Sequence, residues 1–334
     1  MEISKLMDFG KLIADAKIKH IGPMFHHRQF GEKMGGMRGR LVTIAGFSGS
    51  CKTTYALDMA YYNATKLGYT SVFLSLEMEP SELWKKLLLR HSENHKFTRY
   101  RKVDSVNGYD WSGLSIDNFN FLKNIVAEDF KKNMAYGHII IVSTDDLVKH
   151  GIDNLLPAIE KDIMASPFKD KYWGIDLFFV DYIQLLGNFL YHQYSQKNNR
   201  YQFVGDVIRY LKFLTQTYKT GMNNGIDVIA LSQINREGYK YARDSKDKDK
   251  GYDLTSIAES SEIVNASDIV ITLRYEIVNK KGHCVKAQLL KNRFGETIDE
   301  PVQLLSLPEY CYVGDYREAS QEEMDNIVDE LIGA

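Results

Sequence analysis

The hydrophobic positions of this chain fall into short, uninterrupted runs, separated by longer segments in which apolar residues recur at helical spacing. The uninterrupted runs cover residues 41–45, 70–76, 138–142, 175–180 and 226–232. Runs of this length predict strands that are buried on both faces, as in a parallel sheet. We therefore expect an α/β fold with a central, mostly parallel sheet flanked by helices.

Two later runs, residues 268–275 and 283–291, flank the turn-forming sequence at 279–282 and predict a hairpin. Helical spacing occurs at 54–64, 81–90, 115–133 and from about 203 onward. Residues 2–19 predict a short amphipathic helix, which packs either on its own core or on a neighbouring subunit. We expect an N-terminal linker-type helix and connector over 1–30, one α/β domain over 31–312 and an acidic tail over 313–334. The tail is either solubilising or partner-binding.

The segment after the first run, Gly46-Phe47-Ser48-Gly49-Ser50-Cys51-Lys52-Thr53, joins a strand to a helix through a glycine-bearing loop. Backbone N–H groups and the positive end of the helix then face a phosphate, which Lys52 can also reach, and the Thr53 hydroxyl can bind Mg²⁺. ATP with Mg²⁺ is the predicted ligand, and the alternative is a turn that binds nothing. The predicted nucleotide-binding residues are Gly46, Ser48, Gly49, Ser50, Cys51, Lys52, Thr53 and Thr54.

Cys51 departs from this pattern, which has glycine immediately before the lysine. The backbone passes close to the phosphates at this point, and a Cβ with a sulfur narrows the space. We expect the side chain to point away from the nucleotide, toward the strand that carries Asp181, as a small buried hydrophobe. Its position at a helix N-terminus predicts a lowered thiol pKa.

Polar residues follow three of the predicted strands: Glu77, Asp181 and Gln233. The carboxyl ends of parallel strands meet at one edge of a sheet, so these side chains are expected near the phosphates. Asp181 ends its apolar run as a Walker B aspartate does and is predicted to hold Mg²⁺ together with Thr53. The Gln233 amide can sense the γ-phosphate by hydrogen bonding.

Four ordered motifs follow the phosphate loop: Ser75-Leu76-Glu77-Met78, Asp181-Tyr182-Ile183-Gln184-Leu185, Leu231-Ser232-Gln233-Ile234-Asn235-Arg236 and Lys291-Asn292-Arg293-Phe294-Gly295. In order and spacing, the chain from about residue 35 to 305 resembles the motor domain of DnaB-type replicative helicases, in a compact form without the N-terminal collar domain. The resemblance implies a RecA-like P-loop ATPase core. It also implies a ring, usually of six subunits, that translocates on single-stranded DNA in replication.

The same resemblance implies roles for individual residues. Lys52 neutralises the transferred phosphate, Glu77 orients or deprotonates the attacking water, and Gln233 couples phosphate loss to the DNA loop that follows it. Lys291 and Arg293 alternate at the end of a predicted strand and are predicted to complete the site of an adjacent subunit, as arginine fingers do. Surface salt bridging is the alternative for Arg293.

Two segments are candidates for contact with DNA. One is a predicted loop at 187–201 with Lys197 and Arg200, and the other spans 236–252 with Arg236, Lys240 and Arg243. Cations that follow a phosphate backbone bind any sequence, with salt-sensitive affinity. The second segment alternates lysine with aspartate, so a nearly self-neutralised surface loop is the alternative.

Composition sets further bounds. The net charge of −2 gives no global basic field, so DNA contact requires a local patch or a ring lumen. Cys51, Cys284 and Cys311 are too scattered for a disulfide framework or a zinc site. No apolar run approaches the roughly 18 residues that span a bilayer, and we expect a soluble protein of a bacterial or phage-infected cytosol.

Other functions fit the same motifs. One is a RecA- or KaiC-like ATPase that remodels DNA or protein without unwinding. Another is a nucleotide-dependent ring scaffold whose Cys51 has cost it turnover. A primase or a loader protein is a candidate partner of the helicase.

Overall fold

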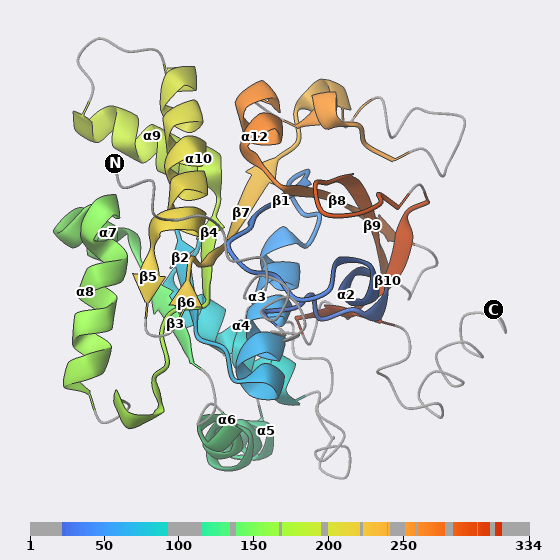
Figure 1. The fold of residues 1–334 in the computed structure, drawn as a ribbon. Helices are drawn as coiled ribbons and strands as arrows, with labels where there is room; N and C mark the ends of the chain where they lie inside the picture. The colour runs from blue at the N-terminus through green and yellow to red at the C-terminus, as the bar shows by residue number, and fades with distance from the viewer. Residues whose placement is uncertain are drawn as a thin grey trace, which may run out of the picture.

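A nine-stranded sheet runs through the centre of the protein, in the order β11-β10-β9-β8-β1-β7-β4-β2-β3. Helices cover both of its faces (Figure 1). The predicted α/β fold with a mostly parallel sheet flanked by helices is confirmed. The computed structural model describes residues 22–92, 115–133, 138–166, 169–194, 200–220, 223–238, 240, 251–257, 260–277, 283–298, 300–307 and 311–315.

The parallel part of the sheet corresponds to the apolar runs of the sequence. It consists of β1 (Leu41–Gly46), β2 (Ser71–Ser75), β3 (Ile139–Val142), β4 (Leu177–Asp181), β7 (Asp227–Gln233) and β8 (Ile269–Ile277). The predicted hairpin follows, with β9 (His283–Asn292) antiparallel to β8, and the sheet ends in the antiparallel strands β10 (Val302–Leu307) and β11 (Tyr312–Gly314). A separate two-stranded ribbon pairs β5 (Lys219–Thr220) with β6 (Asn223–Asn224).

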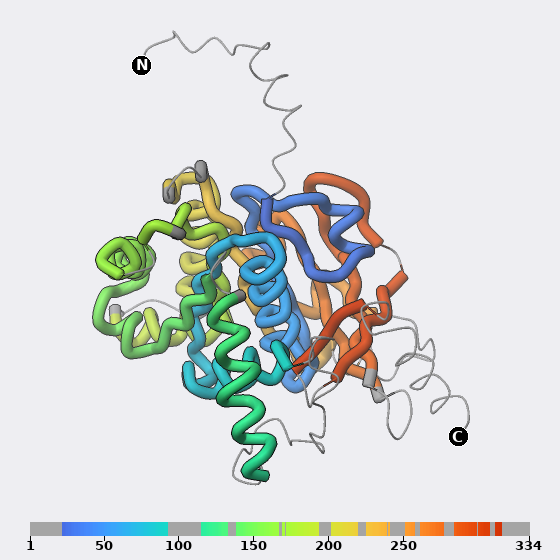
Figure 2. The backbone as a smooth tube through the Cα atoms, turned by 90° about the horizontal axis from the view of Figure 1, so that it is seen from below, coloured from blue at the N-terminus to red at the C-terminus, as the bar shows by residue number. Residues whose placement is uncertain are grey.

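Helices connect the strands and supply the outer layers. They are α2 (Arg28–Met34), α3 (Lys52–Tyr62), α4 (Pro80–Ser92), α5 (Ile116–Phe121), α6 (Ala127–Asn133), α7 (Thr144–His150), α8 (Ile152–Ala165), α9 (Ile183–Tyr194), α10 (Arg200–Thr217) and α12 (Ser260–Ala266). Shorter helical segments are η1 (Asn63–Leu67), η3 (Leu122–Val126), η4 (Lys169–Lys171) and η5 (Leu254–Ser256). With η3 between them, α5 and α6 form one continuous helical rod that projects from the rest of the protein (Figure 2). No helix among the residues described is long and apolar enough to cross a membrane.

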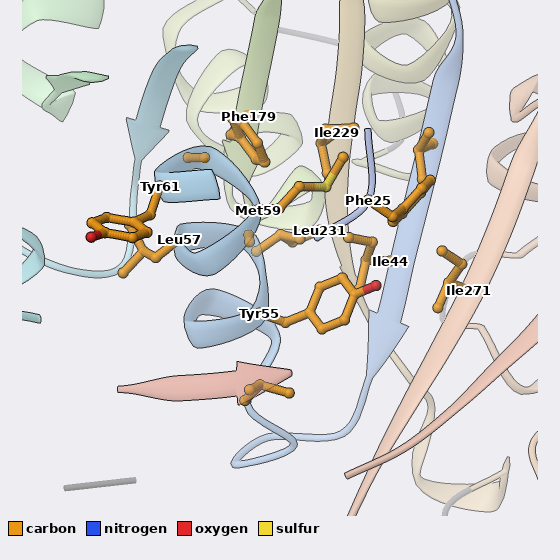
Figure 3. Close-up of a cluster of buried hydrophobic side chains, with 14 of the residues drawn as sticks. Phe25, Ile44, Tyr55, Leu57, Met59, Tyr61, Phe179, Ile229, Leu231 and Ile271 are labelled. Carbon is orange, nitrogen blue, oxygen red and sulfur yellow. The ribbon is translucent and has the colours of Figure 1, made fainter. Parts of the chain in front are cut away.

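The core has two halves, one on each face of the sheet, because successive strand residues point to opposite sides. On one face Ile44, Phe179 and Ile229 pack with Tyr55 and Met59 of α3 (Figure 3). On the other face the alternate positions of the same strands pack against the helices α8, α9 and α10. This arrangement fixes α3, the helix that follows the phosphate loop, directly against the central strands.

The outer edge of β11 is covered by side chains of the same molecule. Val313 donates its N–H to Oδ2 of Asp58 on α3 at 2.6 Å, and its carbonyl accepts from Nε2 of His26 at 2.6 Å. Asp58 also pairs with Arg90 of α4, and burial raises the pKa of Asp58 to about 6 although Arg90 opposes the shift. The last described strand is therefore joined to α3 by buried polar contacts.

The predicted loop at 187–201 is wrong over its first half, because α9 continues through Tyr194. The predicted loop began at Gly187, but this residue lies inside the helix, where α9 meets α10. A Cβ at this position would come within 2.7 Å of the Val204 side chain. The glycine therefore serves close helix packing. The predicted N-terminal helix, residues 195–199 and the acidic tail from 316 onward lie outside the described residues.

Asp227, the first residue of β7, is a buried carboxyl that couples stability to pH. Its Oδ1 accepts the Arg40 N–H at 2.9 Å, and burial raises its pKa to about 7, with Asp176 adding to the shift and Arg40 opposing it. The folded pKa lies above the unfolded value of about 3.9. The contribution of Asp227 to stability is therefore full below the unfolded pKa and is lost as the pH rises toward 7.

We expect Asp227→Asn to remove this loss, because an amide oxygen accepts the same N–H and does not ionise. The Tm of the variant minus that of the wild type should be more positive at pH 8 than at pH 5, measured by thermal unfolding. Asp253→Asn is the control, and its Tm difference from the wild type should not change between pH 5 and pH 8, since hydrogen bonds from Thr255 and Ser256 lower the pKa of Asp253 and keep it ionised over that range. A pH-independent difference for Asp227→Asn would contradict the shift.

Candidate nucleotide-binding site

The loop between β1 and α3 has the backbone geometry of an anion cradle. Gly49 and Cys51 both have positive φ, 78° and 65°, on either side of Ser50. Alternating backbone conformations of this kind turn successive N–H groups toward one point, and the N-terminus of α3 adds its positive end. Gly46 ends β1 so close to β8 that a Cβ would lie 2.8 Å from the Leu273 carbonyl oxygen. The remaining predicted binding residues, Ser48 and Thr54, lie in the loop and in the first turn of α3.

Lys52 is held within this loop. Its Nζ donates to the carbonyl oxygens of Gly46 at 2.9 Å and Phe47 at 3.0 Å, and its side chain is buried. Burial lowers the pKa of Lys52, whereas the nearby carboxylates of Asp181 and Glu77 raise it. The ammonium group therefore lies at the mouth of the cradle, beside the two carboxylates of the site.

Thr53 and Asp181 form the predicted pair. The Thr53 hydroxyl donates to Oδ2 of Asp181 at 2.7 Å, while the buried Oδ1 has no hydrogen-bond partner among the described residues. Burial raises the pKa of Asp181 to about 6, Glu77 adds to the shift, and Thr53 and Lys52 oppose it. Hard divalent cations prefer such hydroxyl and carboxylate oxygens. The residues present therefore fit a magnesium ion.

Glu77 and Gln233 lie at the same edge of the sheet. Glu77 is exposed in the turn after β2, which is closed by the Ser75 hydroxyl donating to the Met78 carbonyl at 2.6 Å. The Leu76 N–H donates to the Asp181 carbonyl at 2.9 Å, which joins this turn to the end of β4. Gln233 is half-buried, and its N–H donates to the Gln184 side chain at 3.3 Å.

Lys86 is a residue of this site that the motifs did not predict. It lies on α4, is buried, and is close enough to Asp181 and Cys51 to lower the pKa of both groups. A signal was present, because Lys86 follows Leu83 by three residues and precedes Leu87 on the buried stripe of α4.

The predicted properties of Cys51 are only partly correct. Its side chain packs against the core, but its polar neighbour is Ser306 of β10 and not the strand of Asp181. Burial raises the pKa of the thiol, and Ser306, Lys86 and Lys52 oppose the shift without reversing it. The predicted lowering is therefore wrong, because desolvation outweighs the field of the helix N-terminus. Rapid alkylation at neutral pH is not expected.

The left-handed backbone at Cys51, with φ 65° and ψ 22°, gives a matched pair of variants. Cys51→Gly should be about 0.5–1 kcal/mol more stable than Cys51→Ala, because both lose the thiol and only alanine keeps the steric strain of this conformation. Urea unfolding measures the difference. We also expect Cys51→Gly to keep or raise ATP turnover. Equal stability of the two variants would contradict the left-handed conformation.

Lys291 and Arg293 do not lie near Lys52 of the same chain. Lys291 lies in the antiparallel strand β9 and Arg293 follows its last residue. Asn292 of β9 pairs with Ile269 at the start of β8, whereas Gly46 pairs with Leu273. Lys291 and Arg293 therefore lie at the end of the sheet where the parallel strands begin, and the phosphate-binding loop lies at the end where those strands finish. Ile269 and Leu273 are four residues apart, which corresponds to roughly 13 Å along β8.

The predicted DNA-contacting residues are only partly described. Arg200 begins α10, and Arg236 and Lys240 are exposed after β7. Lys197 and Arg243 lie outside the described residues. The base of the second segment is closed by the Asn235 N–H donating to the Ser256 carbonyl at 2.8 Å and by a bridge between Ile234 and Ile257.

Most of the chain matches a known protein family. The family model of the DnaB-like helicase C terminal domain matches residues 25–310. The replicative DNA helicase DnaB of Geobacillus stearothermophilus is 26% identical over 281 residues, which cover 83% of this chain and 52% of that protein. A probable plasmid replicative DNA helicase of Chlamydia psittaci is 24% identical over 275 residues, which cover 80% of this chain and 50% of that protein. The chain spans about half the length of these relatives.

Two solved structures share the fold. One is an isolated ATPase domain that superposes with a TM-score of 0.63 at 18% identity, covering 92% of this chain and 96% of that one. The other is a DnaB-like replicative helicase, studied for its interactions with primase. It superposes with a TM-score of 0.64 at 20% identity, and the match covers 92% of this chain and 66% of that chain. The expected RecA-like core agrees with these superpositions.

Proposed function

The chain belongs to the DnaB-like helicase C-terminal domain family, and we propose that it is the motor of an ATP-driven ring that moves along single-stranded DNA in replication. The observation that carries the proposal is the 2.7 Å hydrogen bond from Thr53 to Asp181 beside the N–H cradle at residues 46–51. This is the arrangement that holds a nucleoside triphosphate with its metal ion in P-loop ATPases.

The described residues divide the work of ATP hydrolysis. Lys52 binds the oxygens of the terminal phosphates, and Thr53 and Asp181 would hold magnesium, which supplies positive charge to those oxygens when bound. Glu77 orients or deprotonates the attacking water, because it is exposed at the same edge and close enough to raise the pKa of Asp181. Gln233 links loss of the phosphate to the segment after β7.

The positions of Lys291 and Arg293 support the proposal of a ring. Lys291 and Arg293 lie near the start of β8, away from Lys52 of the same chain, and we propose that they complete the site of another copy. Head-to-tail contacts between copies close into rings when the rotation permits, and we propose six subunits. Single-stranded DNA would pass through the lumen along the segments that contain Arg200, Arg236 and Lys240, with primase or a loader protein as partners.

The test is ATP hydrolysis by the full chain with and without single-stranded DNA, followed by unwinding of a forked duplex. We expect stimulation and unwinding, with DNA binding that weakens as salt rises. Stimulation without unwinding would favour a RecA- or KaiC-like remodelling ATPase. The absence of both stimulation and unwinding would favour a nucleotide-dependent scaffold. Native mass spectrometry with and without ATP tests the ring directly.

The cytosol of a bacterium or of a phage-infected cell is the proposed location, since the relatives named above are bacterial.

A further inference from the structure

Asp268, between α12 and β8, binds Arg293 through both its main chain and its side chain. The Asp268 carbonyl accepts the Arg293 N–H at 2.9 Å, and Oδ1 accepts from Nη1 of Arg293 at 3.3 Å. The other carboxylate oxygen, Oδ2, accepts the Leu41 N–H of β1 at 2.9 Å and is 2.5 Å from Nζ of Lys212. The side chain of Asp268 is only 3% exposed. Arg293 is thereby fixed to the first residue of the central strand.

The end of α12 provides the remaining anchors. Nη2 of Arg293 donates to the Asn265 carbonyl at 2.6 Å, and Nζ of Lys291 donates to the Val264 carbonyl at 2.6 Å. Carbonyls in the last turn of a helix lack intrahelical partners and carry partial negative charge, so they suit cations. A guanidinium has five N–H donors, and these side-chain contacts use two. The Arg293 side chain is 45% exposed, so it can still bind an external anion.

The local charge also favours an anion. Lys212 is neutralised by its ion pair with Oδ2 of Asp268, and Lys291 and Arg293 add two further positive charges close to the same carboxylate. Burial lowers the pKa of Lys291, and the charges of Arg293 and Lys212 lower it further, while Asp268 opposes them. The charges of Lys291 and Arg293, which repel one another, would be stabilised by a bound phosphate oxygen.

We propose that Asp268 is the positioning residue that orients Arg293 toward the terminal phosphate of a nucleotide bound by a second copy of this chain. This inference rests on the proposed function. A free arginine side chain loses considerable rotamer freedom when it binds, and a carboxylate anchored on β1 removes that freedom beforehand. Asp268 acts through Arg293 and does not itself touch the nucleotide.

The test is ATP hydrolysis by the full chain carrying Asp268→Asn, in the presence of single-stranded DNA. We expect kcat to fall about tenfold or more, because a charge-assisted contact is lost, while ATP affinity stays unchanged. On an Arg293→Ala background, Asp268→Asn should have no further effect. Lys212→Met is the matched control, since it breaks the same Lys212–Asp268 ion pair but leaves the Arg293 contacts in place. It should hydrolyse ATP within about twofold of wild type.

A second comparison applies if Asp268→Asn folds poorly. The double variant Lys212→Met/Asp268→Asn removes both members of the ion pair, so no lysine is left without its partner. It should be about tenfold slower than Lys212→Met alone. The inference would be overturned if Asp268→Asn lowered kcat by the same factor in the Arg293→Ala background as in the wild type. It would also be overturned if Lys212→Met hydrolysed ATP as slowly as Asp268→Asn. Arg293→Ala at the wild-type rate is a different failure, which would overturn the trans-acting assignment in the proposed function itself.

Discussion

Arg293→Ala is expected to lower ATP hydrolysis by about 10³- to 10⁵-fold while nucleotide binding stays close to that of the wild type. The guanidinium lies at the opposite edge of the sheet from the cradle of its own chain, so its removal leaves the Lys52 site intact. Its effect arises only when charge develops on a phosphate held by a neighbour. Steady-state hydrolysis and binding of a fluorescent ATP analogue measure the two properties separately.

Mixing experiments provide the control for action between subunits. Neither Arg293→Ala nor Lys52→Ala alone should hydrolyse ATP at an appreciable rate. Mixed rings contain some interfaces that pair an intact cradle with an intact Arg293, so a fraction of the activity should return. No recovery at any mixing ratio, with co-assembly confirmed by native mass spectrometry, would refute the shared site.

Glu77→Gln is expected to lower hydrolysis by about 10²- to 10⁴-fold and to leave ATP binding intact. The amide keeps the shape of the side chain but cannot accept a proton from water. Glu77 is exposed in the turn after β2, so the substitution should not disturb the fold. Single-turnover hydrolysis and equilibrium ATP binding are the measurements.

Glu79→Gln is the matched control, because Glu79 is an exposed glutamate two residues away on the same turn. It should hydrolyse ATP at nearly the wild-type rate. Lys52→Ala should differ from both variants by losing binding as well as hydrolysis, since the lysine contacts the phosphates before and during the reaction. Normal turnover in Glu77→Gln would show that another residue activates the water.

The sequence predicted those parts of the protein that depend on local pattern. Strands buried on both faces require uninterrupted apolar runs, and Lys52, Thr53 and Asp181 occur at strand ends that a parallel sheet brings to one edge. The pairing of Thr53 with Asp181, 128 positions apart, follows from that topology alone.

The errors arose where tertiary packing decided the outcome. Gly187 serves the contact between α9 and α10 and does not break the helix. Lys86 is buried because α4 turns that side of the helix inward, and Cys51 has a raised pKa because burial outweighs the helix end. The environments of Gly187 and Cys51 are not visible in the residues that flank them, whereas the spacing of Lys86 from Leu83 and Leu87 did indicate its burial.

The covered edge at β11 limits how copies of this chain can meet. A free edge strand offers unpaired N–H and C=O groups to any extended segment that approaches it, and this is a common route to aggregation. Asp58 and His26 already occupy both outward-facing groups of Val313. A neighbouring molecule therefore cannot extend the sheet at this residue. Contacts with another copy at this edge must instead depend on side-chain surfaces, whose fit can be loosened and restored during each cycle of ATP hydrolysis without breaking a continuous ladder of backbone hydrogen bonds.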